Sequence, residues 1–494
     1  MMTWFLWGYF LLLGFLAVYG LHRYWLIGQA WRAARRPSPA APAVAEADWP
    51  MVTIQLPIYN ERYVAERAIR SACAVDYPRE RLDIQVLDDS TDDTRQIIDR
   101  CVAEARQAGV PIVCLRRGSR AHYKAGALAY GLRRARGEFL AIFDADFLVP
   151  REFLRQTIPH LVAAPRLGLV QARWSHINRD YSLLTPLQAI LLDGHFMVEQ
   201  VARSSSGRFF NFNGTAGVWR RRAIVDAGGW QHDTLTEDLD LSYRAQLRGW
   251  RARFLPEVVC PAELPVEMNA FKTQQHRWTK GSIQTAMKLL PRILRAPVAA
   301  RLKLEACLHL TTDLNNPVGV LVALCVLPAM VWRISLGRYQ FLLVDLPLLA
   351  LLSVSHLCFY GLALRRVCAD WRQRLWGLPL AMALGVGMLL TNTRAAVEAL
   401  AGHRSEFVRT PKFHVERKTN RWWQKRYSAR PDALTSLELG CAAYFTVAVL
   451  YAARRGCYGS LPFLLLFQLG FLYVGGLSLW QRSLFVWRRR PERI

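Results

Sequence analysis

Six long apolar runs place the strongest constraint on how this chain can fold. The first is residues 3–27, which are almost free of charge and carry tryptophan and tyrosine near both ends. A run of this length spans the hydrocarbon core of a bilayer, and aromatic side chains suit its headgroup regions. A cleaved signal peptide is the alternative, but the run is too long and no small-residue cleavage site follows it. The other apolar runs are residues 305–333, 341–364, 375–400, 437–453 and 461–481.

Positive charge indicates which of these runs cross the membrane. If all six crossed, the basic segment 401–437 would lie outside, although Arg and Lys are concentrated on the cytoplasmic side of membrane proteins. We therefore expect residues 375–400 to lie at the interface, because their second half, Thr391–Leu400, is polar and has a helical pattern. Five crossings remain, with the N-terminus outside and the basic segment and C-terminus in the cytoplasm. Residues 280–304 alternate basic and apolar side chains and are expected to form another interfacial stretch.

The net charge of +26 does not indicate a nucleic-acid partner. The basic residues form no single motif but cluster beside the apolar runs, where they favour anionic lipid and mark the cytoplasmic side. The ten cysteines are scattered and include no Cys-x-x-Cys pair, so we expect neither a sulfur-bound metal nor a disulfide framework.

Between the first apolar run and the later ones, the pattern alternates strand and helix after a Pro/Ala linker at residues 37–49. This alternation predicts a parallel sheet covered by helices on both faces. Ligands of open α/β sheets bind at the carboxyl ends of the strands, where several acidic residues fall. The expected strands are Val52–Tyr59, Ile84–Leu87, Pro111–Leu115 and Phe139–Phe143, and the expected helices are Glu61–Val75, Thr91–Ala108 and Lys124–Ala135.

Asp144 and Asp146 follow a predicted strand and are candidate metal ligands. In an extended segment, residues two apart point to the same side, so both carboxylates could reach one divalent cation. Hard oxygen ligands favour Mg²⁺ or Mn²⁺, which would neutralise a leaving diphosphate. An isolated Asp-x-Asp is more often a solvated turn, so the assignment depends on the neighbouring clusters.

A second acidic cluster begins with Asp88 and Asp89, at the end of another predicted strand. These two carboxylates are placed to contact a base or ribose, whereas Asp92 and Asp93 are expected to cap the following helix. Lys124 begins the next predicted helix, and a lysine there can face a diphosphate because helix N-termini favour anions.

Two further clusters lie at the start of a helix and along another. Glu237 and Asp238 lie at the start of a predicted helix, with Asp240 close behind. One of these three acids can act as the general base that an inverting transfer requires, while the others cap the helix; capping alone is the alternative. Gln274, Arg277 and Trp278 fall on one helix face, where Arg can hold phosphate and Trp can support a sugar ring. A membrane-surface helix is the alternative for this segment.

With these four clusters in hand, the chain resembles the processive family-2 glycosyltransferases. These include cellulose synthase and, more closely, the plant cellulose-synthase-like A and C (mannan and glucan) synthases with their bacterial relatives. The resemblance covers roughly residues 1–430, and 36 residues separate Asp238 from Gln274, as the family pattern expects. The matching strings are Gln55–Glu61, Val86–Asp92, Tyr123–Ala127, Phe143–Phe147, Asn213–Trp219, Thr236–Asp238 and Gln274–Trp278.

The resemblance implies a glycosyltransferase-A fold, a UDP- or GDP-sugar donor, Mg²⁺ or Mn²⁺, and inversion to a β-linkage. It places the nucleotide at Asp88 and Asp89 and the catalytic base at Asp238. The diphosphate and metal would lie at Asp144 and Asp146.

The resemblance also assigns the acceptor side. Gln274, Arg277 and Trp278 would line the acceptor and diphosphate region, and Asn213, Gly214 and Thr215 would lie near the acceptor end. Cellulose synthase has a Cys-Gly-Ser type sequence at the latter position, which leaves the acceptor open. A gating-like loop is expected at Phe407, Val408, Arg409, Thr410 and Lys412, although its match to the Phe-x-Val-Thr-x-Lys pattern is imperfect.

The sequence therefore predicts a glycosyltransferase-A domain inserted in a helical transmembrane region of the inner membrane, with the catalytic domain in the cytoplasm. The leading hypothesis is an inverting β-glycosyltransferase that extends a glucan or mannan; the alternatives are a glycolipid-forming transferase and a non-catalytic scaffold or transporter. Fewer crossings than in cellulose synthase, and no cyclic-dinucleotide domain, argue against a long secretion channel formed by one chain.

The expected segments are 1–30 (membrane helix), 31–49 (linker), 50–278 (transferase domain), 279–304 (interfacial helices), 305–365 (two membrane helices), 375–436 (interfacial helix and gating-like loop), 437–482 (two membrane helices) and 483–494 (cytoplasmic tail).

Overall fold

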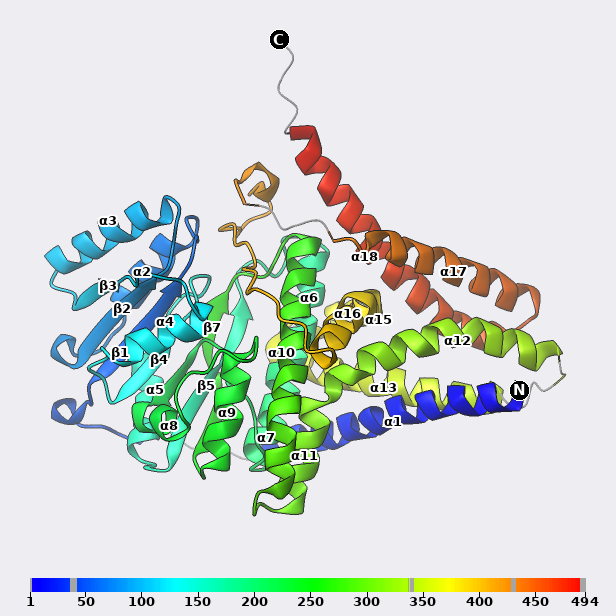
Figure 1. The fold of residues 1–494 in the computed structure, drawn as a ribbon, viewed down its shortest axis with the longest axis horizontal. Coiled ribbons are helices and arrows are strands. Elements are labelled where there is room, and N and C mark those ends of the chain that lie inside the picture. The colour runs from blue at the N-terminus through cyan, green and yellow to red at the C-terminus, as the bar shows by residue number, and fades with distance from the viewer. Residues whose placement is uncertain (1, 36–41, 336, 338–341, 428–431, 489–494) are drawn as a thin grey trace, which may run out of the picture.

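The computed structural model describes residues 2–35, 42–335, 337, 342–427 and 432–488. Parts of the expected linker, gating-like segment and tail lie outside these residues. Figure 1 shows a sheet domain at one end of the molecule and long apolar helices at the other, with α6, α10 and α16 between them. The active site expected from the sequence would therefore lie close to the membrane helices.

The sheet has seven strands in the order β3-β2-β1-β4-β6-β5-β7. Neighbours β3-β2, β2-β1, β1-β4 and β5-β7 are parallel, but β6 pairs antiparallel with both β4 and β5. The expectation of a purely parallel sheet is therefore wrong, because the chain leaves the sheet after β5, passes through α6 and α7, and returns in the opposite direction. The strands are β1 Val52–Ile58, β2 Leu82–Asp88, β3 Ile112–Leu115, β4 Phe139–Ile142, β5 Leu167–His176, β6 Gly217–Arg220 and β7 Arg251–Ala262.

Helices cover both faces of the sheet, as expected. One hydrophobic core packs α2, α3 and α5 against the sheet, and a second packs α4, α8 and α9 against its other face. The three expected helices are present and shorter than predicted, because turns occupy the residues just before two of them. The helices are α2 Ala65–Cys73, α3 Thr94–Gln107, α4 Tyr123–Leu132, α5 Phe153–Val162, α8 Arg221–Asp226 and α9 Glu237–Leu247.

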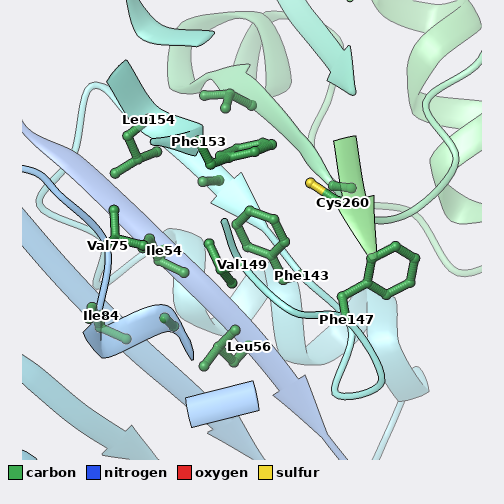
Figure 2. Close-up of a cluster of buried hydrophobic side chains, with 14 of the residues drawn as sticks. Ile54, Leu56, Val75, Ile84, Phe143, Phe147, Val149, Phe153, Leu154 and Cys260 are labelled. Carbon is green, nitrogen blue, oxygen red and sulfur yellow. The ribbon is translucent and has the colours of Figure 1, made fainter. Parts of the chain in front are cut away.

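The first core holds the strands that carry the site (Figure 2). Ile54 and Leu56 of β1 lie in the same cluster as Phe143 and Phe153, and all four are buried. The rings of Phe143 and Phe153 meet edge to face at 4.8 Å. Each such side chain contributes about 1.5–3 kcal/mol when it is fully buried, so the end of β4, where Asp144 lies, is firmly held.

Between the sheet and the membrane helices lie α6 Leu184–Gly194, a π-helical turn His195–Gln200, α7 Val201–Ser205, α10 Met268–Arg295 and α11 Ala300–Leu310. Helix α10 runs through the predicted boundary at 278/279, so the motif helix and the basic segment after it form one continuous element as far as Arg295. The ammonium of Lys272 in α10 lies 2.6 Å from the carboxylate of Glu438 in α17. Since both side chains are buried, this ion pair fixes α10 to a membrane helix.

Five helices in the described part of the chain are long and apolar enough to span a membrane. Their number equals the predicted number of crossings. The apolar run at 305–333 is interrupted, since α11 ends at Leu310 and α12 begins at Asn315. The spanning helices are α1 Met2–Ala33, α12 Asn315–Ser335, α13 Leu342–Val367, α17 Thr435–Arg454 and α18 Leu461–Arg488.

Residues 375–400 form two helices, α15 Gly377–Gly387 and α16 Leu389–Leu400, with a bend of 41° between them. The bend separates the apolar half of the run from its polar half. The pair could form one broken span or a re-entrant loop, so the expected interfacial position stays a prediction. Before the pair, α14 Trp371–Arg374 forms a single turn.

Helices α15 and α18 approach closely at glycines, and this contact leads to a first prediction. A Cβ at Gly470 would overlap the carbonyl oxygen of Ala383, whereas a Cβ at Gly476 of the same helix meets nothing within 4 Å. We expect Gly470→Ala to lower the unfolding free energy by about 1–3 kcal/mol, because the two backbones must move apart. Thermal unfolding in detergent measures the change, with Gly476→Ala as the control. Equal midpoints for the two variants would contradict this account of the packing.

Candidate active site

A pocket of about 180 Å³ opens at the carboxyl ends of the strands. Asp89, Asp144 and Glu263 directly follow β2, β4 and β7 or lie one residue beyond them, and His176 ends β5. Helix α10 and residues 407–412 complete the lining. The strand ends thus gather side chains from distant parts of the sequence, as the α/β pattern predicted.

Lys124 occupies the centre of the charged cluster. Its ammonium lies 2.5 Å from a carboxylate oxygen of Asp144 and donates to the carbonyl of Gly214 at 3.0 Å. Although burial alone lowers the pKa of Lys124, Asp144 and Glu237 raise it above its ordinary value. A charged lysine therefore stands among the pocket carboxylates at neutral pH.

The turn at Gly214 brings backbone against the acids at the start of α9. Gly214 has a positive φ of 81°, and a Cβ there would lie 2.9 Å from a carboxylate oxygen of Asp238. Both the positive φ and the close approach of the Asp238 carboxylate require glycine at this position. The turn therefore determines how much space lies in front of Asp238.

Two acids lie at the N-terminal end of α9, Glu237 buried and Asp238 half-buried. Burial and the neighbouring Glu237 raise the pKa of Asp238 to about 7, with Lys124 opposing the shift. Burial likewise raises the pKa of Glu237. A carboxyl group with such a pKa can accept a proton near neutral pH, as a general base must.

Asp144 and Asp146 are both paired with lysines. Asp144 faces Lys124, and Asp146 lies 2.6 Å from the ammonium of Lys412. Within the described residues no group of three or more His, Cys, Asp or Glu side chains could hold a metal ion. Mg²⁺ and Mn²⁺ are nevertheless commonly held by one or two carboxylates together with substrate phosphates. The two oxygen-donor side chains therefore fit a cation whose coordination a diphosphate completes.

The structure separates the roles of the paired acids after β2. Asp89 lines the pocket and receives two bonds from Arg117, at 2.8 and 2.5 Å. Asp88 is 1% exposed and does not line the pocket, because Arg116 at 2.7 Å and the backbone N–H of Ser90 at 2.9 Å occupy its carboxylate. Of this pair, only Asp89 is placed to contact a ligand directly.

The expected gating-like loop lies across the pocket. Arg409 pairs with Glu61 at 2.7 Å, while Lys412 contacts Asp146 and donates to the backbone carbonyl of Glu263 at 2.7 Å. Burial raises the pKa of Glu61 to about 7, although Arg409 opposes the shift. Two cations of one segment thus meet carboxylates from different strand ends.

Helix α10 supports the other side of this loop. The guanidinium of Arg277 lies 4.5 Å from the ring centre of Phe407 and donates to the carbonyl of Val408 at 3.3 Å. The Phe407 ring also stacks on Tyr123 at 6.0 Å. The loop is therefore in contact with the start of α4 and with the Gln-x-x-Arg-Trp helix at once.

The π-helical turn at His195–Gln200 holds Asn213. The Asn213 amide nitrogen lies 2.8 Å from Nε2 of His195, and its oxygen accepts from Gln200 at 2.7 Å. Nδ1 of His195 lies 3.0 Å from Glu199. This partner assigns the proton to Nδ1, which leaves Nε2 to accept from Asn213.

The same turn is connected to the first membrane helix. Glu199 pairs with Arg203 at 3.3 Å, Arg203 with Glu305 at 3.0 Å, and Glu305 with His22 of α1 at 2.8 Å. Arg203 and His195 lower the pKa of Glu199, although burial opposes them. A continuous series of polar contacts thus leads from α1 to the pocket.

Most of the predicted site residues come together in this one pocket. Three do not line it: Asp88; Thr215, whose hydroxyl is buried and accepts from the Asp144 N–H at 2.9 Å; and Val408, which is exposed. The predicted residues that line it are Asp89, Lys124, Asp144, Asp146, Asn213, Gly214, Glu237, Asp238, Gln274, Arg277, Trp278, Phe407, Arg409, Thr410 and Lys412.

Sequence reasoning assigned no role to several lining residues. Glu61 ends the string Gln55–Glu61, so its acidic side chain after a strand was a usable signal. His176 ends β5 and Glu263 follows β7, two strands that the sequence pattern did not reveal. Further examples are Tyr59, Arg120, Tyr123, Trp174 and Leu192.

Comparisons with known proteins agree with this geometry. The family model described as glycosyltransferase like family 2 matches residues 50–281. Glucomannan 4-beta-mannosyltransferase 2 of Arabidopsis thaliana is 36% identical over 457 residues, covering 88% of this chain and 82% of the relative. Glucomannan 4-beta-mannosyltransferase 1 of Cyamopsis tetragonoloba is 45% identical over 263 residues, covering 52% of this chain and 50% of the relative.

Among solved structures, a mannosyltransferase from Pyrobaculum calidifontis in complex with GDP-Man and Mn²⁺ superposes with a TM-score of 0.52. It is 23% identical and covers 79% of this chain and 100% of that chain. The likeness concerns the fold, and it confirms the glycosyltransferase-A architecture expected from the sequence.

The loop contacts lead to a second prediction. Lys412→Ala removes the ion pair with Asp146 and the bond to Glu263, so residues 405–413 should lose their attachment to the pocket. Breaking one partner of a buried pair costs about 3–5 kcal/mol, and we expect at least roughly tenfold faster hydrogen exchange in this segment. Hydrogen exchange followed by mass spectrometry measures the change. Lys418→Ala, which changes an exposed lysine five residues beyond this segment, is the control, and equal exchange in the two variants would refute the contact.

Proposed function

The chain belongs to glycosyltransferase family 2, and from this membership we propose that it is a mannan or glucomannan synthase that uses GDP-mannose. It is a multi-pass membrane hexosyltransferase that moves sugar from a nucleotide donor to a polysaccharide. The observation that carries the proposal is the 36% identity to a glucomannan 4-beta-mannosyltransferase across 88% of the chain. The curated relatives' names point to mannose, and GDP is the nucleotide we assign to that donor.

We assign the general base to Asp238. In the reaction, a hydroxyl oxygen of the acceptor forms a bond to the anomeric carbon of the donor as the bond from that carbon to the diphosphate oxygen breaks. The proton of the hydroxyl passes to the Asp238 carboxylate, and GDP leaves with the electron pair. Attack from the face opposite the leaving group inverts the configuration and produces a β-linkage. The turn at Gly214 keeps the space beside Asp238 open for the hydroxyl.

Cationic side chains of the pocket would hold the diphosphate. Lys124 stands at the start of α4, where backbone N–H groups and the helix dipole also favour anions, and Arg277 lies on the α10 side. A divalent cation, Mg²⁺ or Mn²⁺, held by Asp144 and Asp146, would neutralise charge on the leaving diphosphate. Asp89 and Tyr59, at the β1–β2 end of the pocket, would contact the nucleoside.

We further propose that the pocket faces the cytoplasm of a bacterial inner membrane. The sheet domain and the segment after α16 lie on one side of the long helices (Figure 1), and residues 401–427 of this segment are strongly basic. A concentration of Arg and Lys favours the cytoplasmic side. Sugar nucleotides are made in the cytoplasm, so this orientation gives the donor direct access.

A third prediction tests the donor and the base together. Purified protein in nanodiscs, supplied with Mn²⁺, should form polymer from GDP-mannose rather than from UDP-glucose or UDP-N-acetylglucosamine. Asp238→Asn should reduce transfer by roughly a hundredfold or more, because the amide cannot accept the proton. Radiolabel incorporation with mass analysis of the products measures both effects.

The control for that variant is Asp233→Asn, which changes a half-exposed carboxylate paired with Lys288. It should retain transfer within about twofold, as expected for a surface ion pair. Undiminished transfer in Asp238→Asn would remove the base assignment. Products limited to lipids carrying one or a few sugars would replace the polymer by a glycolipid.

A fourth prediction concerns pH. Because the pKa of Asp238 is raised to about 7, the carboxyl group is protonated below that pH and cannot accept a proton. We expect kcat/KM to fall about tenfold per pH unit below pH 7 and to level off above it. Initial rates between pH 5.5 and 8.5, at donor concentrations well below KM, provide the profile of kcat/KM. A flat profile across this range would contradict a base with a raised pKa.

A further inference from the structure

His176 and Trp174 line the end of the pocket formed by β5 and α6, with Asp193 behind them, and the proposed transfer uses none of the three. Both ring nitrogens of His176, the indole N–H of Trp174 and one carboxylate oxygen of Asp193 are buried and have no hydrogen-bond partner in the described part of the chain. The side chains of His176 and Asp193 are each 1% exposed. Buried polar groups are rarely left without a partner, so such a cluster indicates a polar ligand.

The geometry of His176 suits a neutral donor and acceptor. Its Nε2 lies 3.6 Å from Oδ1 of Asp193, longer than a normal hydrogen bond, and the other oxygen of Asp193 is held by Arg179 at 2.5 Å. Burial lowers the pKa of His176, although Asp193 opposes the shift, so the ring is neutral at pH 7. A neutral imidazole presents one N–H and one acceptor nitrogen, which together can satisfy a hydroxyl group.

The surroundings indicate a sugar rather than a phosphate. The charge of Asp193 is compensated by Arg179 at 2.5 Å. Among the described residues, neither Arg179 nor the neighbouring Arg173 lines the pocket, so this cluster presents no cation to a ligand there. Trp174, Leu192 and Pro265 line the same pocket beside His176. An aromatic and apolar wall combined with a few fixed polar groups is suited to the alternating faces and edges of a pyranose ring.

The position in the sheet separates this subsite from the nucleotide. Tyr59 and Asp89 follow β1 and β2, whereas His176 ends β5, three places further along the sheet from β1. The cationic and acidic cluster around Lys124 and Asp144 lies between these ends, at β4. A ligand at His176 would therefore approach the transfer point from the side opposite the nucleoside.

We propose that His176, with Trp174 and supported by Asp193, forms a subsite that binds the hydroxyl groups of the acceptor glycan. His176 contacts the bound sugar and so selects and positions the acceptor, while Asp193 is a positioning residue that orients the imidazole. The inference rests on the proposed function for the chemical class of the glycan. It adds a specificity-determining contact that is distinct from the base and from the donor site.

The test, the fifth prediction, measures glycan binding without any donor. Wild-type protein in nanodiscs is titrated with β-1,4-linked mannotetraose and with cellotetraose by calorimetry. We expect at least one glycan to bind and His176→Phe to weaken that binding roughly five- to tenfold, the effect of losing one or two net hydrogen bonds. His176→Gln, which keeps a donor and an acceptor, should recover part of the affinity.

Two controls make the test specific. His160→Phe replaces another buried histidine, which contacts Arg253 and does not line the pocket, and it should bind the glycan as the wild type does. The KM for GDP-mannose should stay within about twofold in every variant, because the contact lies on the acceptor side. If His176→Phe does not fold, as judged by thermal unfolding, His176→Ala takes its place.

Three results would overturn the inference. The wild type and His176→Phe could bind the glycan with equal affinity, or the wild type could bind neither glycan. The third is a loss of affinity in His160→Phe as large as that in His176→Phe. Failure of the proposed function is a separate result. A protein that binds mannotetraose or cellotetraose but does not turn over GDP-mannose would contradict the proposed donor, while the comparison between His176 variants would still decide the subsite.

Discussion

The compensation of buried charge in the pocket is the constraint on which the rest of the structure depends. Carboxylates from four strand ends and from the start of α9 are brought into one small volume, and each would be costly there without a cation. The cations come from elsewhere: Lys124 from α4, Arg277 from α10, and Arg409 and Lys412 from the segment after α16. The sheet domain therefore cannot complete its own site. It requires α10 and the 407–412 segment, both of which are attached to the membrane helices.

This dependence explains why the membrane helices and the sheet are joined so firmly. Helix α10 carries the Gln-x-x-Arg-Trp face at one end and continues unbroken past the predicted domain boundary. Lys272 ties it to α17 through Glu438, and Lys280 of the same helix reaches Glu398 of α16 at 2.8 Å. On the opposite side, Arg203 and Glu305 connect the turn that holds Asn213 to His22 of α1. The position of pocket side chains is thus set by α10, α16 and the helices long and apolar enough to span a membrane.

Local sequence patterns predicted the parts of this molecule in which a residue's role follows from its neighbours in the chain. The apolar runs, the four strands with Asp88 and Asp144 at their ends, and the order of the acidic clusters could all be recognised in this way. The family was confirmed, and five helices in the described part of the chain are long and apolar enough to span a membrane. The antiparallel β6 and the strands β5 and β7 could not be recognised, because pairing partners far apart in sequence decide their direction. For the same reason His176 and Glu263 were missed. The different surroundings of Asp88 and Asp89 depend on Arg116 and Arg117, whose reach across the loop is a tertiary property.

The two ends of the pocket differ in electrostatic character, and this difference suits an enzyme that must bind one substrate repeatedly and retain another. At the β1–β4 end, fixed cations and carboxylates match a ligand of high charge. Lys124 and Arg277 would hold its phosphates and would release them once these cations pair again with the pocket carboxylates. At the β5 end, Asp193 is neutralised by Arg179, and Trp174 and His176 present an aromatic wall with few polar atoms. An uncharged glycan is held there by contacts that are individually weak and similar for each successive sugar. Departure of the nucleotide therefore does not weaken the contacts that retain the glycan, and a chain can stay in place between additions.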